Sequence, residues 1–238
     1  MNIDTNVYRK HESPTFGNTL LGAVPLVSEV YLMDNIELMK HYPDKYFDLA
    51  VVDPPYGIGV NMNMGRRKGM GTKHTNKNWD NTAPLVEYFT ELFRVSQNQI
   101  IWGGNYFDLP PSRCFIIWDK KTPEDLSFAM CEFAWTSFDK VAKIFRKPIQ
   151  TDNNNRIHPT QKPIPLYDWI FQNYATKGMK ILDTHAGSMS SVISAMKNEM
   201  QITAYEIDSD YFNAGKKRIE NYLQQGDMFN QPKIEFIS

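Results

Sequence analysis

Short apolar runs bounded by polar residues recur along the chain and predict buried strands. Six such runs lie at 30–33, 47–52, 99–102, 114–118, 180–182 and 201–205. Between several of them, apolar residues recur at helical spacing, which predicts helices at 35–41, 85–95, 165–174, 190–196 and 210–225, the last ending before Gly226. Strands that alternate with helices indicate a mostly parallel sheet covered on both faces. The pattern therefore predicts an α/β fold whose ligand lies at the carboxyl ends of the strands.

The composition is that of one domain with a large core. The 238 residues are 42% hydrophobic and 13% aromatic, and no second compositional half or repeat is evident, so we expect a single domain over 1–238. No apolar stretch approaches the roughly 20 residues that span a bilayer, and residues 1–16 lack the apolar core of a secretory signal. We therefore expect a cytoplasmic protein without membrane contact. Two distant cysteines and five scattered histidines argue against a disulfide framework and against a structural metal.

A net charge of −1 conceals two strongly basic segments. A basic insertion at about 57–80 carries five cations and no acid before Asp80: Arg66, Arg67, Lys68, Lys73 and Lys77. A second segment at about 140–162 carries six cations against the single acid Asp152: Lys140, Lys143, Arg146, Lys147, Arg156 and Lys162. Such segregation favours two arms that contact a polyanion from an acidic body. Two exposed loops without a ligand remain the alternative on charge alone.

The sequence Asp53-Pro54-Pro55-Tyr56 directly follows the apolar run at 47–52. Two prolines fix the backbone and remove two N–H donors, so the carbonyl groups of Asp53 and Pro54 are free to point into a pocket. A carboxylate, a carbonyl and an aromatic ring at one corner suit a planar group with an exocyclic amine, since the oxygens accept its protons and the ring stacks on its face. A tight turn with a buried tyrosine is the alternative reading of these four residues.

A second group of candidate residues follows the run at 180–182, where small residues lead into a helix: Asp183, Thr184, Ala186, Gly187 and Ser188. Gly187 and its small neighbours allow the backbone to approach a ligand closely. The next strand ends at Glu206, close to where an α/β nucleoside-binding unit places a carboxylate that receives ribose hydroxyls. The loop lacks a G-x-G-x-x-G sequence, which makes a ligand with ribose but without pyrophosphate the better fit. An ordinary strand–helix–strand unit remains the alternative for the loop alone.

Together these motifs resemble the N6-adenine DNA methyltransferases of the β-group, in which the DPPY motif precedes the cofactor motif. Three further segments support the resemblance: Tyr31-Leu32-Met33-Asp34, the Asn105-Tyr106 pair after the run at 99–102, and His158-Pro159-Thr160-Gln161-Lys162-Pro163. The resemblance covers most of the chain, from about Val30 to Arg218. It implies an S-adenosylmethionine-dependent methyltransferase fold of Rossmann-like type, with a mostly parallel, seven-stranded sheet. It also implies that Asp34, Thr160, Gln161 and Lys162 join the second group in binding S-adenosylmethionine.

The resemblance further implies a mechanism and a partner. Asp53 and the Pro54 carbonyl would accept the protons of adenine N6, Pro55 would fix the corner and Tyr56 would stack on the base. The base must be flipped out of double-stranded DNA to reach this pocket, and the cations of the insertion at 57–80 would bind phosphates. The oligomeric state is left open, with a homodimer as one possibility.

One residue departs from the family pattern, and two alternatives to the leading function follow. The family usually has a second glycine where this chain has Met189, whose side chain either crowds the cofactor or points into the packing between helix and sheet. A chain that has lost catalysis and only binds nucleic acid is therefore one alternative. Methylation of cytosine N4 is the other, although related cytosine enzymes tend to carry serine at the position of Asp53. We expect Trp102, Trp118 and Trp135 to be core residues, and Asp34 is also a candidate helix N-cap.

Overall fold

The computed structural model describes residues 27–59, 82–123, 129–148, 156–224 and 232–238. All five cations predicted to bind DNA in the insertion at 57–80, and Gly226, lie outside the described residues. In the part of the chain that is described, no helix is long and apolar enough to cross a membrane.

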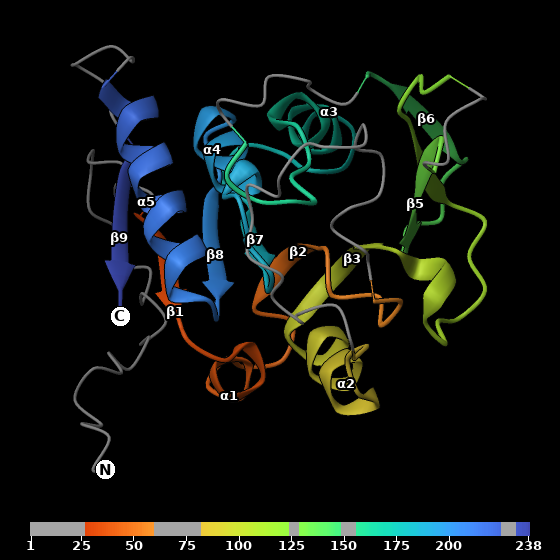
Figure 1. The fold of residues 1–238 in the computed structure, drawn as a ribbon. Helices are drawn as coiled ribbons and strands as arrows, with labels where there is room; N and C mark the ends of the chain where they lie inside the picture. The colour runs from red at the N-terminus through yellow and green to blue at the C-terminus, as the bar shows by residue number, and fades with distance from the viewer. Residues whose placement is uncertain (1–26, 60–81, 124–128, 149–155, 225–231) are drawn as a thin grey trace.

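Nine strands form one sheet in the order β6-β4-β5-β3-β2-β7-β8-β1-β9 (Figure 1). Their bounds are β1 Val27–Leu32, β2 Phe47–Val52, β3 Ser96–Trp102, β4 Phe115–Asp119, β5 Cys131–Thr136, β6 Lys143–Arg146, β7 Lys180–Asp183, β8 Gln201–Glu206 and β9 Lys233–Ile237. Every neighbouring pair is parallel except those of β5, which is antiparallel to both β3 and β4. The mostly parallel sheet is thus confirmed, with nine strands where seven were expected.

Helices cover both faces of this sheet, as the pattern predicted. They are α1 Asn35–Met39, α2 Val86–Val95, α3 Ile164–Tyr174, α4 Ser190–Lys197 and α5 Ser209–Gln224, together with a short 3₁₀ turn, η2, at Gly104–Tyr106. Buried residues of α1 and α2 form one apolar cluster with the sheet, and those of α3, α4 and α5 form the other. Figure 1 accordingly shows α1 and α2 apart from the other three helices, with the sheet between them.

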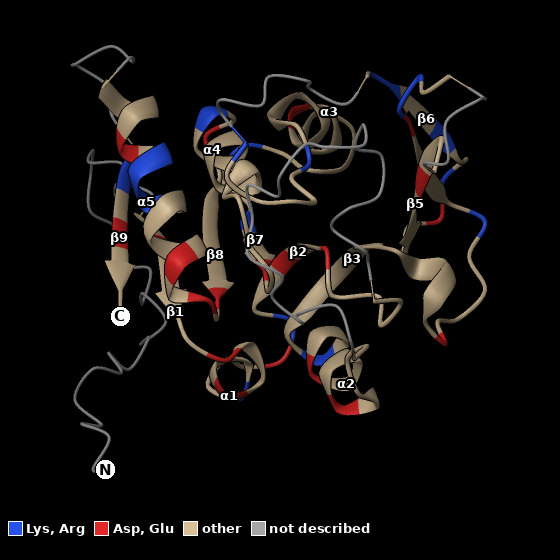
Figure 2. Cartoon of the chain, in the orientation of Figure 1, with Lys and Arg blue, Asp and Glu red and all other residues tan. Residues whose placement is uncertain are grey.

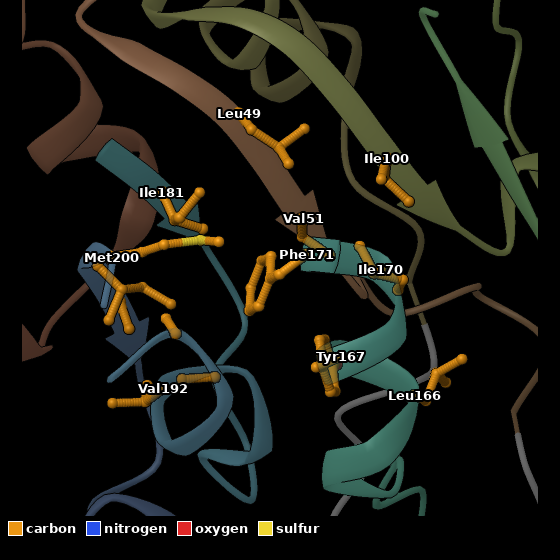
Figure 3. Packing of buried hydrophobic residues seen from close by; sticks show 14 of the residues in the cluster. Leu49, Val51, Ile100, Leu166, Tyr167, Ile170, Phe171, Ile181, Val192 and Met200 are labelled. Atoms are coloured by element: carbon orange, nitrogen blue, oxygen red, sulfur yellow. The ribbon is translucent and has the colours of Figure 1, made fainter. Parts of the chain in front are cut away.

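The central strands contribute side chains to both clusters because alternate residues of a strand point to opposite faces. On β2, Leu49 and Val51 belong to the cluster with α3 and α4, whereas Ala50 and Val52 belong to the cluster with α1 and α2. Figure 3 shows the first of these clusters, in which side chains of β2, β3 and β7 meet those of α3 and α4. Burial on both faces explains why β2 is an unbroken apolar run.

Six strands and five helices were predicted at nearly their observed positions, but β5, β6 and β9 were not predicted. The two outermost strands, β6 and β9, contain charged, alternately exposed residues and therefore lack an apolar run. In β5 the run is interrupted by Glu132. Trp102, Trp118 and Trp135 are all buried, which confirms them as core residues.

Candidate active site

A cavity of about 440 Å³ lies at the carboxyl ends of the four adjacent strands β2, β7, β8 and β1. The loops that follow these strands line it, together with the segment that precedes α3. All but one of the predicted catalytic and cofactor residues line this cavity: Asp34, Asp53, Pro54, Pro55, Tyr56, Thr160, Gln161, Lys162, Thr184, Ala186, Gly187, Ser188 and Glu206. The structure therefore brings together groups that are separated by more than half the chain.

Asp183 is the predicted residue that does not line the cavity. Its buried carboxylate accepts hydrogen bonds from the hydroxyl of Ser191 and from the backbone N–H of His185, the latter at 3.0 Å. Burial raises the pKa of Asp183 to about 7, although both hydrogen bonds oppose the shift. Asp183 thus stabilises the conformation of the loop that follows β7 through these hydrogen bonds.

At one end of the cavity, Asp53 and Tyr56 form the corner that the sequence predicted. The Tyr56 hydroxyl donates a hydrogen bond of 2.7 Å to Asp53 Oδ1, and the Tyr56 ring stacks on Tyr106 with centroids 5.1 Å apart and an interplanar angle of 18°. Gly103 has a φ of +67°, and a Cβ atom there would overlap the Tyr56 ring. Only glycine combines that conformation with that close approach, so Gly103 fixes the position of Tyr56.

Lys162 also lies at this end. Its side chain is only 3% exposed, and its ammonium forms ion pairs with Asp53 Oδ2 and, at 3.0 Å, with Glu132 Oε2 on β5. The second oxygen of Glu132 is paired with Lys120 at 2.6 Å. The prediction placed Lys162 among the cofactor-binding residues, and in the structure its ammonium faces the Asp53 carboxylate.

The pKa values of these groups are set by competition between burial and neighbouring charge. Burial raises the pKa of Asp53, and the Lys162 ammonium offsets only part of that shift. Burial alone would lower the pKa of Lys162, but Asp53 and Glu132 outweigh it and raise the value. For Glu132 the opposite holds, because Lys162 and Lys120 overcome burial and lower its pKa. The ionised forms therefore depend on one another.

At the other end of the cavity, Glu206 terminates β8 and is 9% exposed. One carboxylate oxygen accepts the backbone N–H of Gly187 at 2.8 Å, and the other accepts that of Asp208 at 2.9 Å. Each oxygen keeps a free acceptor position. Burial raises the pKa of Glu206, and the backbone N–H groups of Asp208, Gly187 and Ile207 oppose the shift. The arrangement leaves a fixed carboxylate that can accept two further hydrogen bonds from a ligand.

Met189 points away from the cavity, into the helix packing. It has a φ of +60°, is fully buried, and lies against α5 where Gly215 has no side chain; a Cβ atom at Gly215 would overlap Met189 Cγ. Arg218 of α5 also donates to the Ser188 carbonyl and, at 2.9 Å, to the Ser190 hydroxyl. The loop is therefore braced from α5, and the departure from the family pattern leaves the cavity open.

A network that sequence reasoning missed joins this loop to α1 and α2. Tyr88 of α2 and Thr184 share a hydrogen bond of 2.6 Å, and Thr184 Oγ1 lies 2.9 Å from His185 Nδ1. Asn35 of α1 donates to the Thr184 carbonyl at 3.1 Å and lies 3.2 Å from His185 Nε2. Burial lowers the pKa of His185 to about 4, so its ring is neutral at neutral pH. Asp34 both lines the cavity and caps α1, since it accepts the N–H of Ile36 at 2.9 Å.

Most described cations of the segment at 140–162 have partners within the chain. Lys140 and Lys143 donate to Asn173, at 3.3 and 2.6 Å, and Arg146 pairs with Asp119 at 3.5 Å. Arg156 donates to the carbonyl of His158 at 3.3 Å. Figure 2 shows the lysines and arginines around β6, on the side of the sheet away from β8. A DNA-binding role for this segment stays a prediction, and the charges available for it are partly used within the fold.

No family model matches the chain, but individual proteins do. "Putative methylase YubD" of Escherichia coli strain K12 is 22% identical over 218 residues, which cover 81% of this chain and 92% of that protein. Among solved structures, the M1.HpyAVI–SAM complex is similar with a TM-score of 0.54 and 19% identity, covering 81% of this chain and 99% of that one. PvuII DNA methyltransferase, which is cytosine-N4-specific, gives a TM-score of 0.56 at 13% identity, covering 87% of this chain and 91% of that one. The chain therefore has the fold of S-adenosylmethionine-dependent methyltransferases.

Proposed function

We propose that this protein is an S-adenosylmethionine-dependent DNA methyltransferase that modifies the N6 amine of a flipped-out adenine. The observation that carries the proposal is one continuous cavity with a carboxylate at each end, the buried Glu206 at one and the partly exposed Asp53 at the other. The similar structures support it, since one is named as a complex with SAM and another as a DNA methyltransferase.

The residues around Glu206 fit the cofactor. Its two oxygens each have a free acceptor position, which suits the two ribose hydroxyls of a nucleoside. Gly187 has a φ of +46° and presents backbone without a side chain to the ligand. A volume of about 440 Å³ is within the range of small-molecule and cofactor sites. When bound, S-adenosylmethionine supplies an electrophilic methyl group on a sulfonium.

The residues around Asp53 fit an amine that must be made nucleophilic. The lone pair of adenine N6 is delocalised into the ring, so the nitrogen attacks only if its geometry and developing charge are supported. Asp53 and the Pro54 carbonyl would accept the two N6 protons, stabilise the nitrogen as it becomes cationic, and orient it toward the methyl group. Asp53 is also the carboxylate placed to receive the proton that the methylated nitrogen must then lose. Tyr56 would contact the base.

The basic insertion would bind the DNA. An amine inside a duplex cannot reach a buried pocket, so the base has to be flipped out at a cost of about a few kcal/mol. Arg66, Arg67, Lys68, Lys73 and Lys77 follow the catalytic corner directly in the sequence and would neutralise phosphates there.

Cytosine N4 is the competing substrate, because it is an amine with the same chemical problem. The fold accommodates either, as the similarity to the cytosine-N4-specific PvuII enzyme illustrates. The aspartate at position 53 favours adenine, since related cytosine enzymes tend to carry serine there.

Expression in a bacterial host that lacks adenine methylation tests the proposal. We expect mass spectrometry of nucleosides from the host DNA to reveal N6-methyladenine, and none when the expressed protein is Asp53→Ala. N4-methylcytosine in place of N6-methyladenine would establish the competing substrate. Absence of both, with a folded protein that binds S-adenosylmethionine, would overturn the proposal.

A further inference from the structure

Lys162 links two carboxylates that come from different strands. Asp53 follows β2, Glu132 lies on β5, and the ammonium of Lys162 reaches both from the segment before α3. Lys120, at the end of β4, holds the outer oxygen of Glu132. These four groups carry two negative and two positive charges, so the cluster is neutral when all are ionised. The side chains of Asp53 and Glu132 are 18% and 23% exposed, and that of Lys162 is 3% exposed.

Ion pairs around a buried lysine contribute little net stability to a fold. Removing charges from water costs about as much as their mutual attraction returns, and apolar replacements of the same volume are often neutral or stabilising. The cluster nevertheless lines the cavity at the point where Asp53 must accept protons from an amine. The position of the cluster beside Asp53 therefore points to a role in the site rather than in stability.

We propose that Lys162 and Glu132 are positioning residues: Lys162 favours the ionised form of Asp53 and fixes its orientation for the substrate amine, and Glu132 holds Lys162 in place. Lys162 acts on Asp53 directly, and Glu132 acts through Lys162. The inference rests on the proposed function, because it assigns these residues to the amine end of the same site.

The contacts of Lys162 all lie at this end of the cavity. Its ammonium donates a hydrogen bond to Asp53, forms an ion pair with Glu132, and lies 5.0 Å from the centre of the buried Trp102 ring. These contacts direct its charge toward Asp53 and Glu132. Lys162 should therefore contribute to methyl transfer and very little to cofactor affinity.

The contacts of Asp53 still leave room for a substrate. Tyr56 occupies one acceptor position on Oδ1 and Lys162 occupies one on Oδ2. A carboxylate has about four acceptor positions, so an amine proton can be accepted without displacing either partner. The two partners together fix the plane of the carboxylate.

The two positioning residues affect the ionisation of Asp53 in opposite directions. The positive charge of Lys162 lowers the Asp53 pKa, whereas the negative charge of Glu132 raises it. Asp183 and the phenols of Tyr56, Tyr88 and Tyr167 are the other titratable groups that interact with Asp53; Asp53 raises the pKa of each phenol and of Asp183. The phenols stay neutral, so after burial, which is the largest influence on the Asp53 pKa, the charges of Lys162 and Glu132 matter most.

Carbon-13 NMR titration of aspartate side-chain carboxyls in the protein without cofactor measures this directly, with the Asp53 signal assigned by its loss in Asp53→Asn. We expect Lys162→Met to raise the Asp53 pKa by about one to three units, and Glu132→Gln to lower it. Lys162→Arg keeps the charge and should leave the value close to that of the wild type. Lys197→Met breaks another lysine–aspartate pair, with Asp168, outside the cavity lining and should not change the Asp53 pKa.

Kinetics with methyl-labelled S-adenosylmethionine and unmethylated genomic DNA give the second readout. Methyl transfer requires ionised Asp53. The pH below which the rate falls should therefore be higher in Lys162→Met and lower in Glu132→Gln than in the wild type. We expect the kcat of Lys162→Met to fall by about 10²-fold near neutral pH while its cofactor dissociation constant stays within about twofold.

The outcomes separate the inference from the proposed function. An Asp53 pKa that is unchanged, or that shifts in the same direction in both charge-removing variants, overturns the positioning role whether or not the protein methylates DNA. A wild-type protein without methyl transfer overturns the function, and the NMR titration still decides the role of the pair. If Lys162→Met fails to fold, Glu132→Gln and Lys162→Arg, judged by the same titration, decide it.

Discussion

The two ends of the cavity differ in how they hold a carboxylate in place. Each places a carboxylate directly at or after the end of a parallel strand, but Glu206 is held by backbone N–H groups and Asp53 is held by the side chains of Tyr56 and Lys162. Backbone donors belong to the loop itself, so they persist as long as the fold does. Side-chain donors can be exchanged one residue at a time. The Glu206 end, which we propose binds the cofactor, is therefore fixed by the loop itself, whereas the Asp53 end, proposed for the amine, can be adjusted in charge and shape.

The strongest test of this contrast is Asp53→Ala. We expect it to reduce methyl transfer by about 10³-fold or more, because the charged acceptor is lost and the uncharged Pro54 carbonyl can accept only one of the two amine protons. Cofactor affinity measured by calorimetry should be nearly unchanged, since Glu206 and its backbone donors are untouched. Transfer at close to the wild-type rate would remove Asp53 from the catalytic role.

Glu206→Ala is the reciprocal change at the rigid end. We expect S-adenosylmethionine to bind more weakly by roughly 2 to 4 kcal/mol, the loss of charge-assisted hydrogen bonds to two hydroxyls. Calorimetry measures it, and Glu206→Gln, which keeps one acceptor, should lose less. An unchanged dissociation constant would place the ribose elsewhere and break the comparison.

Gly103→Ala perturbs the amine end through shape alone. The new methyl group would overlap the Tyr56 ring and displace it from Asp53 and Tyr106, so we expect kcat/KM to fall by about tenfold or more with little change in cofactor binding. Gly178→Ala is the matched control: its φ of +85° imposes the same backbone strain, but nothing lies within 4 Å of the added atom. Equal losses in both variants would show that strain, and not the position of Tyr56, is responsible.

The smallest effect concerns the brace behind the cofactor loop. Gly215→Ala forces a methyl group against Met189 and should destabilise the protein by about 1 to 3 kcal/mol in urea unfolding. Met189→Gly in the same chain removes the overlap and relieves a positive φ, so the double variant should lose less than the sum of the single changes. Strict additivity would mean that the two residues do not share the space.

The sequence was most informative where burial imposes a simple pattern. Strand β2 is apolar on both faces, and its predicted bounds match those observed. Asp53 and Glu206 were predicted as site residues because each directly follows or ends such a strand, and both line the cavity. Lys162 was predicted to bind the cofactor, and the structure shows its ammonium paired with Asp53. Its partner Glu132 lies on a strand whose apolar run it interrupts, and no spacing rule connects the two positions. This contact depends on which strands are neighbours in the sheet, and no repeat or spacing in the sequence indicates that order.

The hydrogen bonds that tie Thr184 and His185 to Asn35 and Tyr88 have a consequence for local opening of the fold. A ligand that settles on the loop after β7 lowers the free energy of every conformation in which this network is intact. Helices α1 and α2 should then exchange their backbone amide protons with solvent more slowly, although α2 contributes no residue to the cavity lining. Slower amide exchange in α2 would thus indicate that the cofactor end is occupied, although α2 packs on the face of the sheet that carries α1. Helix α2 also follows the basic insertion in the sequence.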